Sequence, residues 1–264
     1  MSASRTARRL ACLLLAAGAS AVSSAQPCPK DDATHVSGAA QCLLARAYGP
    51  AQADVLVVWL HGDVSGGGPA NYHFALAERT AAALPGVAAV ALVRPGYPDG
   101  AGESSGVAAL HAGRNDHYTK ENVEEVGAAL ARLRERAGAK RLVVVGHSGG
   151  AATTAILLGM KPGLIDAAVL VACPCDIVAW RSGRRPWTRS ENPIAWADRV
   201  DPKARVVALT GDADDNTGPA LAERYVEALR KRSIDATFVA LPGESHNGAP
   251  RAPAVLDTVG RLAR

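Results

Sequence analysis

The sequence predicts an α/β fold, in which a mostly parallel sheet carries helices on both faces. Short apolar runs recur from about residue 54 onward without polar alternation, as is typical of strands that are buried on both faces. Segments with helical periodicity separate these runs, and this alternation indicates parallel strands joined by helices. The chain of 264 residues is long enough to bury one sizeable core.

The predicted elements follow one another in a regular order. Six apolar runs are expected to be strands: Val55–Leu60, Val87–Val93, Arg141–Val145, Ala168–Ala172, Arg205–Leu209 and Thr237–Leu241. The segments between and after them are expected to be helices: Tyr72–Leu84, Thr119–Ala137, Ser148–Met160, Pro219–Arg232 and Ala254–Ala263. Thr119 is expected to cap its helix, because a threonine oxygen can accept a hydrogen bond from a backbone N–H of the first turn.

Residues 1–25 have the three parts of a secretory signal peptide. Three arginines precede the apolar stretch Leu10–Ala17, and small residues lead up to a cleavage site after Ala25. The apolar stretch is too short to span a bilayer, and no cysteine follows it at the position of a lipid anchor. We therefore expect a secreted or periplasmic protein without a membrane anchor, in which residues 26–264 form a single domain.

The composition argues against some classes of partner. Cleavage after Ala25 would remove three arginines and lower the formal net charge from +4 to +1. A nearly neutral protein has little electrostatic attraction for nucleic acid or for an acidic membrane. The aromatic content of 4% does not favour a base-stacking surface either. We therefore expect a small-molecule substrate and no nucleic-acid partner.

Four cysteines remain after the predicted cleavage, and an even number in an exported chain favours disulfides. Cys28 and Cys42 are the easiest pair, because a bridge between them closes a short loop. Cys173 and Cys175 are only two residues apart, so a bridge between them is expected to be strained. Free thiols or bonds to the other pair remain open for these two residues. A C-x-C pair alone does not make a metal site, and no metal is predicted.

The pentapeptide at residues 146–150 reads G-H-S-G-G and carries the strongest chemical signal. It follows the apolar run that ends at Val145 and opens an Ala-rich segment. A strand that passes through G-x-S-x-G directly into a helix holds the serine on a sharp turn with its hydroxyl exposed. Ser148 is therefore the candidate nucleophile.

Two later loops offer partners for this serine. A serine hydroxyl needs a histidine base and a carboxylate that orients the histidine. Gly211–Asn216 contains three aspartates and follows one predicted strand, while Gly243–Asn247 contains a histidine and follows the next strand. Both loops leave the carboxyl ends of strands, where open α/β sheets place their sites. We therefore expect the acid and the base on these loops.

With these motifs the chain resembles the α/β-hydrolase superfamily over about residues 53–264, because Ser148, an aspartate and His246 occur in the order of that family's triad. The loop Gly211–Asn216 is similar to family members that read Gly-x-x-Asp-Asp-Asn, in which the first of the paired aspartates serves the histidine. The resemblance thus implies Asp214 as the acid. The same loop also resembles that of prolyl-oligopeptidase-like catalytic domains.

Two backbone amides must bind the negative oxygen that forms when the serine attacks a carbonyl group. Gly149 follows the nucleophile and is expected to supply one of them. The turn His61-Gly62-Asp63 resembles the His-Gly-Gly turn of family esterases, which implies the amide of Asp63 as the second donor. The carboxylate of Asp63 would have to point away from the developing charge, and the amide of Gly62 is the alternative.

Two long connections contain the remaining candidates. Residues 174–203 follow the strand at 168–172 and are expected to form a small lid, because long loops without regular structure are often lids or binding loops. Trp180 and Trp187 in this segment, and Tyr97 in the other connection, residues 94–118, are candidate substrate-binding residues, with packing roles as the alternative. The lid is also rich in arginine, which either an anionic substrate or a solvated surface would explain.

The favoured interpretation is an exported serine hydrolase that cleaves carboxylic esters through an acyl-enzyme and needs no cofactor. The resemblance of the acid loop makes a serine peptidase the first alternative. A noncatalytic binding protein is the second, since a fold does not dictate a function. His111, Asp116 and His117 are interpreted as polar groups of a surface loop and not as metal ligands, because no third ligand motif accompanies them.

Overall fold

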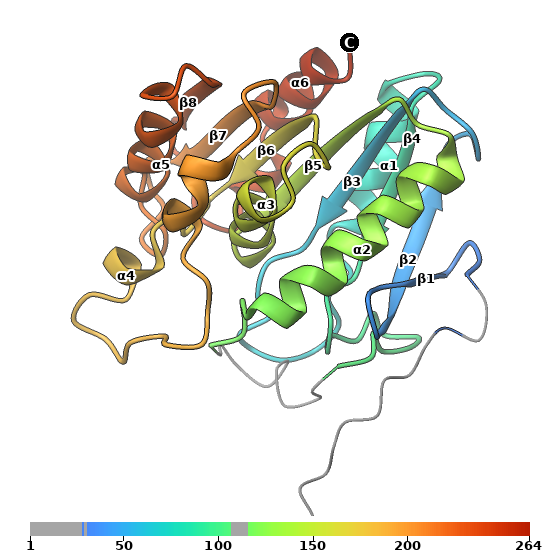
Figure 1. The fold of residues 1–264 in the computed structure, drawn as a ribbon, viewed down its shortest axis with the longest axis horizontal. Coiled ribbons are helices and arrows are strands. Elements are labelled where there is room, and N and C mark those ends of the chain that lie inside the picture. The colour runs from blue at the N-terminus through green and yellow to red at the C-terminus, as the bar shows by residue number, and fades with distance from the viewer. Residues whose placement is uncertain (1–27, 29–30, 107–115) are drawn as a thin grey trace, which may run out of the picture.

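The computed structural model describes residue 28 and residues 31–106 and 116–264, which form an eight-stranded sheet flanked by helices (Figure 1). The strand order is β1-β2-β4-β3-β5-β6-β7-β8. The α/β fold predicted from the sequence is thus confirmed. The predicted signal peptide and His111 lie outside the described residues.

Six neighbouring strands are parallel, and each lies within two residues of its predicted bounds. They are β3 (Val55–Leu60), β4 (Ala88–Leu92), β5 (Arg141–His147), β6 (Ala167–Val171), β7 (Arg205–Gly211) and β8 (Asp235–Leu241). The remaining strands, β1 (His35–Ser37) and β2 (Cys42–Tyr48), pair antiparallel at the β4 edge. They precede the alternation of strands and helices, so the sequence pattern does not predict them.

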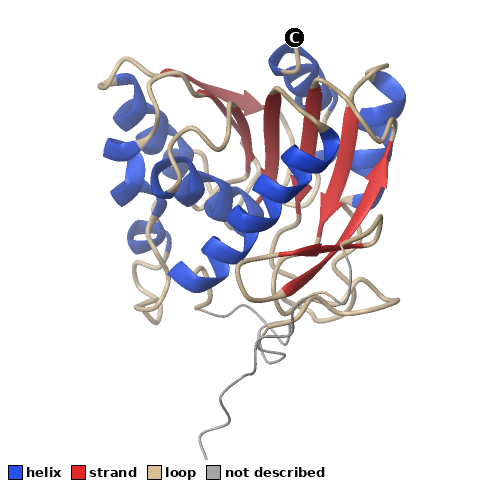
Figure 2. Ribbon diagram, turned by 45° about the vertical axis from the view of Figure 1, so that its right-hand side comes forward, coloured by secondary structure: helices blue, strands red, loops and turns tan. Residues whose placement is uncertain are grey.

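Helices cover both faces of the sheet (Figures 1 and 2). Their bounds are α1 (Phe74–Ala83), α2 (Lys120–Ala137), α3 (Gly149–Met160), α5 (Ala220–Arg230) and α6 (Pro253–Leu262). Successive strand residues point to opposite faces: Val58 and Val144 pack in one core with α2, α3 and α5, while Val57 and Val143 pack in another with α1 and α6. Thr119 caps α2 as expected, accepting a hydrogen bond from the N–H of Asn122.

The segment 174–203 contains regular structure that the sequence does not predict. A short helix, α4 (Ile177–Trp180), begins it, and a 3-10 helix, η2 (Pro193–Arg199), packs against α3. Gly159 of α3 permits this contact, because a side chain there would collide with the backbone of Trp196. The second half of the segment therefore belongs to the core. Among the helices of the described ranges, none combines the length and apolar character that crossing a bilayer requires.

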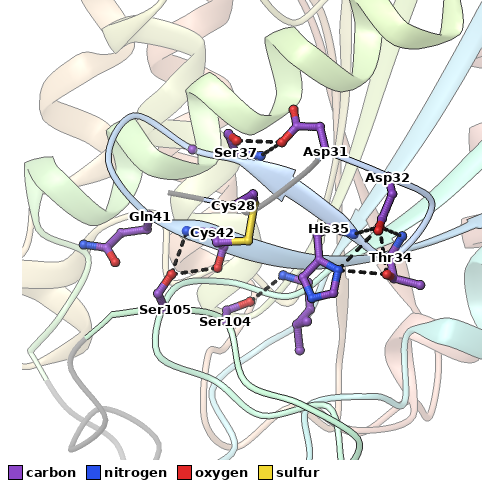
Figure 3. Close-up of a disulfide and its surroundings, with 12 residues drawn as sticks. Cys28, Asp31, Asp32, Thr34, His35, Ser37, Gln41, Cys42, Ser104 and Ser105 are labelled. Atoms are coloured by element: carbon purple, nitrogen blue, oxygen red, sulfur yellow. Dashed lines mark hydrogen bonds and ion pairs between the residues drawn. A yellow bond between two sulfur atoms is a disulfide. The ribbon is translucent and has the colours of Figure 1, made fainter. Parts of the chain in front are cut away.

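Two disulfides tie down separate parts of the chain. Cys28 is bonded to Cys42, the first residue of β2, and Ser105 hydrogen-bonds both the N–H and the carbonyl group of Cys42 (Figure 3). Cys173 is bonded to Cys175, in contrast to the expectation of free thiols or other pairing. The turn after β6 brings their Cα atoms to 5.1 Å, which is an ordinary separation for a disulfide.

Loss of the first disulfide should destabilise the fold without dismantling the sheet. The Cys28→Ser, Cys42→Ser double variant frees a loop with a sequence separation of 14, and the loop entropy then costs about 3 kcal/mol of unfolding free energy. Urea denaturation of the oxidised protein and of the variant measures the difference. Equal stability of the two would show that the bridge does not restrain the unfolded chain.

Candidate active site

Ser148 occupies a sharp turn between β5 and α3. Its φ of 52° and ψ of −115° lie in a region that non-glycine residues rarely adopt. Glycines on either side permit the turn: a Cβ at Gly146 would collide with the backbone of Gly150, and one at Gly150 would collide with the backbone of Leu60 in β3. The serine is therefore held in a strained conformation at the carboxyl end of its strand.

The structure brings Ser148, His246 and Asp214 into one hydrogen-bonded chain. His246 Nε2 lies 3.0 Å from Ser148 Oγ, and His246 Nδ1 lies 2.9 Å from Asp214 Oδ2. The histidine and the aspartate come from the loops after β8 and β7, and the serine follows β5. The ends of three strands at one edge of the sheet therefore contribute to the site. A histidine held in this way can take a proton from the serine while its second N–H donates to the carboxylate.

The carboxylate of Asp214 accepts hydrogen bonds from several surrounding groups. Burial alone would raise the pKa of Asp214, but hydrogen bonds from His246 and from the N–H groups of Thr217 and Asn216 outweigh it and lower the pKa to about 2. The Thr217 hydroxyl lies 2.9 Å from both Asp214 Oδ2 and the carbonyl oxygen of Ala172. Asp214 is therefore ionised at neutral pH and fixed in orientation.

His147 connects the histidine loop to the loop after β3. Burial and the nearby His246 lower the pKa of His147 to about 3, so its ring is neutral at neutral pH. Its Nε2–H donates to the carbonyl oxygen of His246 at 3.0 Å, which leaves Nδ1 to accept from the Tyr72 hydroxyl. That hydroxyl in turn accepts from the N–H of Gly62 at 2.6 Å. The sequence places His147 inside the G-x-S-x-G motif, but it does not reveal this chain of contacts.

The same contacts bear on the predicted amide donors. The N–H of Gly62 is engaged by Tyr72, so the alternative donor already has a partner. Gly149 is the first residue of α3, and its N–H has no acceptor within the helix. The N–H of Asp63 likewise meets no acceptor among the described residues. Asp63 and Gly149 are therefore the amides that remain open to a ligand.

The side chain of Asp63 points into a buried polar cluster. Its carboxylate is 3% exposed and lies 2.6 Å from Arg94 Nη2 and 2.7 Å from the Tyr118 hydroxyl. Tyr97 and His117 also lie beside it. Burial alone would raise the pKa of Asp63, but the charges of Arg94 and His117, together with hydrogen bonds from Tyr118 and Arg94, outweigh this effect and lower the pKa. The charge of this carboxylate is thus balanced by Arg94, so it opposes less strongly a negative charge that develops near the amide of Gly149.

A polar cavity of about 620 Å³ opens beside Ser148. Three predicted substrate-binding residues do not border it. Tyr97 is fully buried and its hydroxyl contacts His117 and Asp63. Trp180 donates from Nε1 to the carbonyl oxygen of Asn216, and Trp187 packs edge-on against Trp180. Trp180 and Trp187 thus have a packing role in the segment 174–203 (the predicted lid segment), while Tyr97 belongs to the buried cluster around Asp63. Contact of these residues with substrate stays a prediction.

Two residues interpreted as surface groups have structural roles. His117 is 3% exposed and lies against Asp63 and Tyr97, because the connection folds inward before α2. Asp116 accepts hydrogen bonds from the N–H groups of residues 188–190 and so joins this connection to the lid segment. Within the described part of the chain, no three potential ligand side chains are grouped as a metal site would need.

Comparison with known proteins places this site in a family. The family model of peptidase S9, the prolyl oligopeptidase family, matches residues 97–258, a range that includes Ser148, Asp214 and His246. The chain belongs to the prolyl oligopeptidase family. A comparison with curated protein sequences found no match.

Solved structures of prolyl-oligopeptidase-like and esterase type share the fold. Est1E from Butyrivibrio proteoclasticus, with ferulic acid bound, is 14% identical over 86% of this chain and 96% of its own, with a TM-score of 0.65. An acylaminoacyl peptidase from Pyrococcus horikoshii is 16% identical over 87% of this chain and 41% of its own, with a TM-score of 0.66. A puromycin-hydrolyzing peptidase from Mycobacterium tuberculosis is 19% identical over 87% and 38%, with a TM-score of 0.64.

Removal of Arg94 should destabilise the protein more than removal of the whole ion pair. Arg94→Met leaves the Asp63 carboxylate buried without a counter-ion, which costs about 3 to 5 kcal/mol of unfolding free energy. The Arg94→Met, Asp63→Asn double variant should recover part of this loss, because no charge is left behind. Urea denaturation measures both variants. A loss below about 1 kcal/mol in Arg94→Met would contradict the role given to the pair.

Because the pKa of Asp214 is low in the folded protein, part of the free energy of unfolding should be lost as the pH falls into the acid range. A carboxylate whose pKa falls from 3.8 to about 2 on folding stabilises the fold above about pH 4 and loses this contribution as the pH falls toward 2. The unfolding free energies of the wild type and of Asp214→Asn should therefore converge by about 1 to 2 kcal/mol between pH 5 and pH 2. A constant difference across this range would show that folding leaves the pKa unchanged.

Proposed function

We propose that this protein is an exported serine hydrolase that cleaves carboxylic esters through an acyl-enzyme. The observation that carries the proposal is the hydrogen-bonded chain from Ser148 Oγ through His246 to Asp214, with distances of 3.0 Å and 2.9 Å. Such a chain supplies a general base beside a nucleophile and a carboxylate that stabilises the imidazolium. Family membership agrees with hydrolysis by a serine nucleophile.

The reaction begins when Ser148 Oγ attacks the acyl carbon of the ester. His246 takes the hydroxyl proton at Nε2 and passes it to the departing alcohol oxygen. The negative oxygen of the tetrahedral intermediate accepts hydrogen bonds from the amides of Asp63 and Gly149, each worth about 3 kcal/mol. Water, deprotonated by His246, then attacks the acyl-enzyme. The bond between the acyl carbon and Ser148 Oγ breaks as His246 returns the proton to that oxygen, and the acid is released. Asp214 keeps the ring oriented throughout.

Export rests on the sequence and on the cysteines. The pattern of residues 1–25 is that of a secretory signal. The bonds Cys28–Cys42 and Cys173–Cys175 are compatible with an oxidising compartment such as the periplasm or the outside of the cell.

Peptide-bond cleavage is the second candidate function. It is favoured by the family match, since the family is named for peptidases. The two functions require the same nucleophile and differ in the leaving group, because an amine departs far less readily than an alcohol. Parallel assays with 4-nitrophenyl acyl esters and with aminoacyl 4-nitroanilides separate them: we expect turnover of the esters, and faster turnover of the anilides would make the protein a peptidase.

Ser148→Ala tests the nucleophile directly. The variant should lose ester hydrolysis by about 10⁴-fold or more in kcat/KM, because the acyl-enzyme cannot form. Ser182→Ala is the matched control, since Ser182 is an exposed serine of the lid segment outside the cavity. Retained turnover in a clean Ser148→Ala preparation would reject the mechanism. Absence of turnover in the wild type would favour a binding protein on this fold.

A further inference from the structure

The cavity beside Ser148 is lined almost entirely by polar groups. Its lining includes Tyr72, Asn216, Asn247 and Arg251, and it contains no aliphatic side chain larger than that of Ala among the described residues. Pockets that accept long acyl chains are lined mainly by apolar side chains, because burial of the chain drives binding. This cavity therefore favours a short, polar substrate.

Two arginines from separate elements reach the cavity. Arg184 lies in the lid segment after α4, and Arg251 ends the 3-10 helix η3 (Ala249–Arg251). Within the described ranges, neither side chain forms an ion pair with a carboxylate. Both positive charges therefore remain available to a ligand in the cavity.

Arg251 is held in place without being neutralised. Its Nη1 donates to the carbonyl oxygen of Asn247 at 2.8 Å, one residue beyond His246. It borders the same cavity as Tyr72, His147 and Ser148. The cation thus lies close to the groups that surround the nucleophile.

The other charges of the cavity cancel these two cations only in part. Asp63 is paired with Arg94 beneath the site. His147 is neutral at neutral pH, because burial lowers its pKa to about 3. Asp215 is exposed, borders the cavity and has no ion-pair partner in the described part of the chain. Two unpaired cations therefore face one unpaired carboxylate.

We propose that the substrates of this site are short esters that carry a negative charge, such as a carboxylate, which Arg184 and Arg251 bind while Ser148 attacks the ester carbon. This inference rests on the proposed ester hydrolysis. The arginines act on affinity and orientation and take no part in proton transfer. Because both are exposed, their attraction is screened by salt and amounts to a factor of about two to five each.

Three esters of equal acyl length test the proposal: 4-nitrophenyl hexanoate, the mono-4-nitrophenyl ester of adipic acid, and 4-nitrophenyl 6-aminohexanoate. They are neutral, anionic and cationic at neutral pH. The kcat/KM for the anionic ester should exceed that for the neutral ester by about fivefold or more at low salt, and the cationic ester should be the poorest. The preference should decrease as sodium chloride is raised, because salt screens exposed charges.

Variants that remove single charges test which residues cause the preference for the anionic ester. Arg184→Gln and Arg251→Gln should each lower the ratio of anionic to neutral kcat/KM by about two- to fivefold, mainly through KM. Asp215→Asn should raise the same ratio, since it removes the opposing charge. Arg185→Gln is the matched control, because Arg185 is a neighbouring exposed arginine outside the cavity, and its ratio should stay that of the wild type.

The outcomes separate this inference from the proposed function. Ser148-dependent turnover with equal or better use of the neutral or cationic ester would overturn the anionic preference and leave the serine esterase intact. An anionic preference that both arginine variants retain would overturn the assignment of the binding residues. If the wild type hydrolyses none of the three esters, the proposed function is contradicted, and the proposed substrate class with it.

Discussion

The close packing at Gly146 and Gly150 is the constraint on which the rest of the site depends. Because neither residue has a side chain, the turn at Ser148 can press against the end of β3 and enter α3 at once. This contact fixes the serine oxygen at the carboxyl edge of the sheet. The loops after β7 and β8 reach the same edge, so His246 meets the serine, and Asp214 meets His246, without any long excursion of the chain.

Buried hydrogen bonds hold the surrounding loops in register with that turn. On one side, the Asp63 carboxylate and Arg94 anchor the loop after β3 beside Gly149. On the other, Tyr72 and His147 link this loop to the backbone of His246. Leaving a buried polar group unpaired is costly, so contacts of this kind hold a loop in one position. The loops that would bind the substrate are therefore set by polar contacts, while the apolar clusters set the sheet beneath them.

The sequence predicts the parts of this arrangement that depend on local pattern and chain order. The strand at 55–60 is found at its predicted bounds, because six successive apolar residues suit a strand that is covered by helices on both faces. Ser148 and His246 can be chosen because their motifs lie directly after strands. The roles of Thr217 and Tyr72 are not predicted from the sequence, because their contacts join segments that are distant in the chain.

Two features of the structure could not be predicted from the sequence, for a related physical reason. The sequence shows that Trp180 has a large apolar surface, but it does not show in which direction the ring points, and the fold uses it to anchor the lid segment. Similarly, the short spacing of Cys173 and Cys175 argues against a bridge, yet the turn after β6 brings the two Cα atoms into the range of ordinary disulfides. Side-chain direction and local turn geometry are properties of the folded chain.

Covalent labelling with a fluorophosphonate tests the central claim most directly, because the probe reacts with a serine oxygen that a neighbouring histidine activates. The account predicts one phosphonyl group per protein molecule, located at Ser148 by peptide mass spectrometry, and loss of labelling in His246→Ala. Labelling at another residue, or undiminished labelling of Ser148 without the histidine, would contradict it.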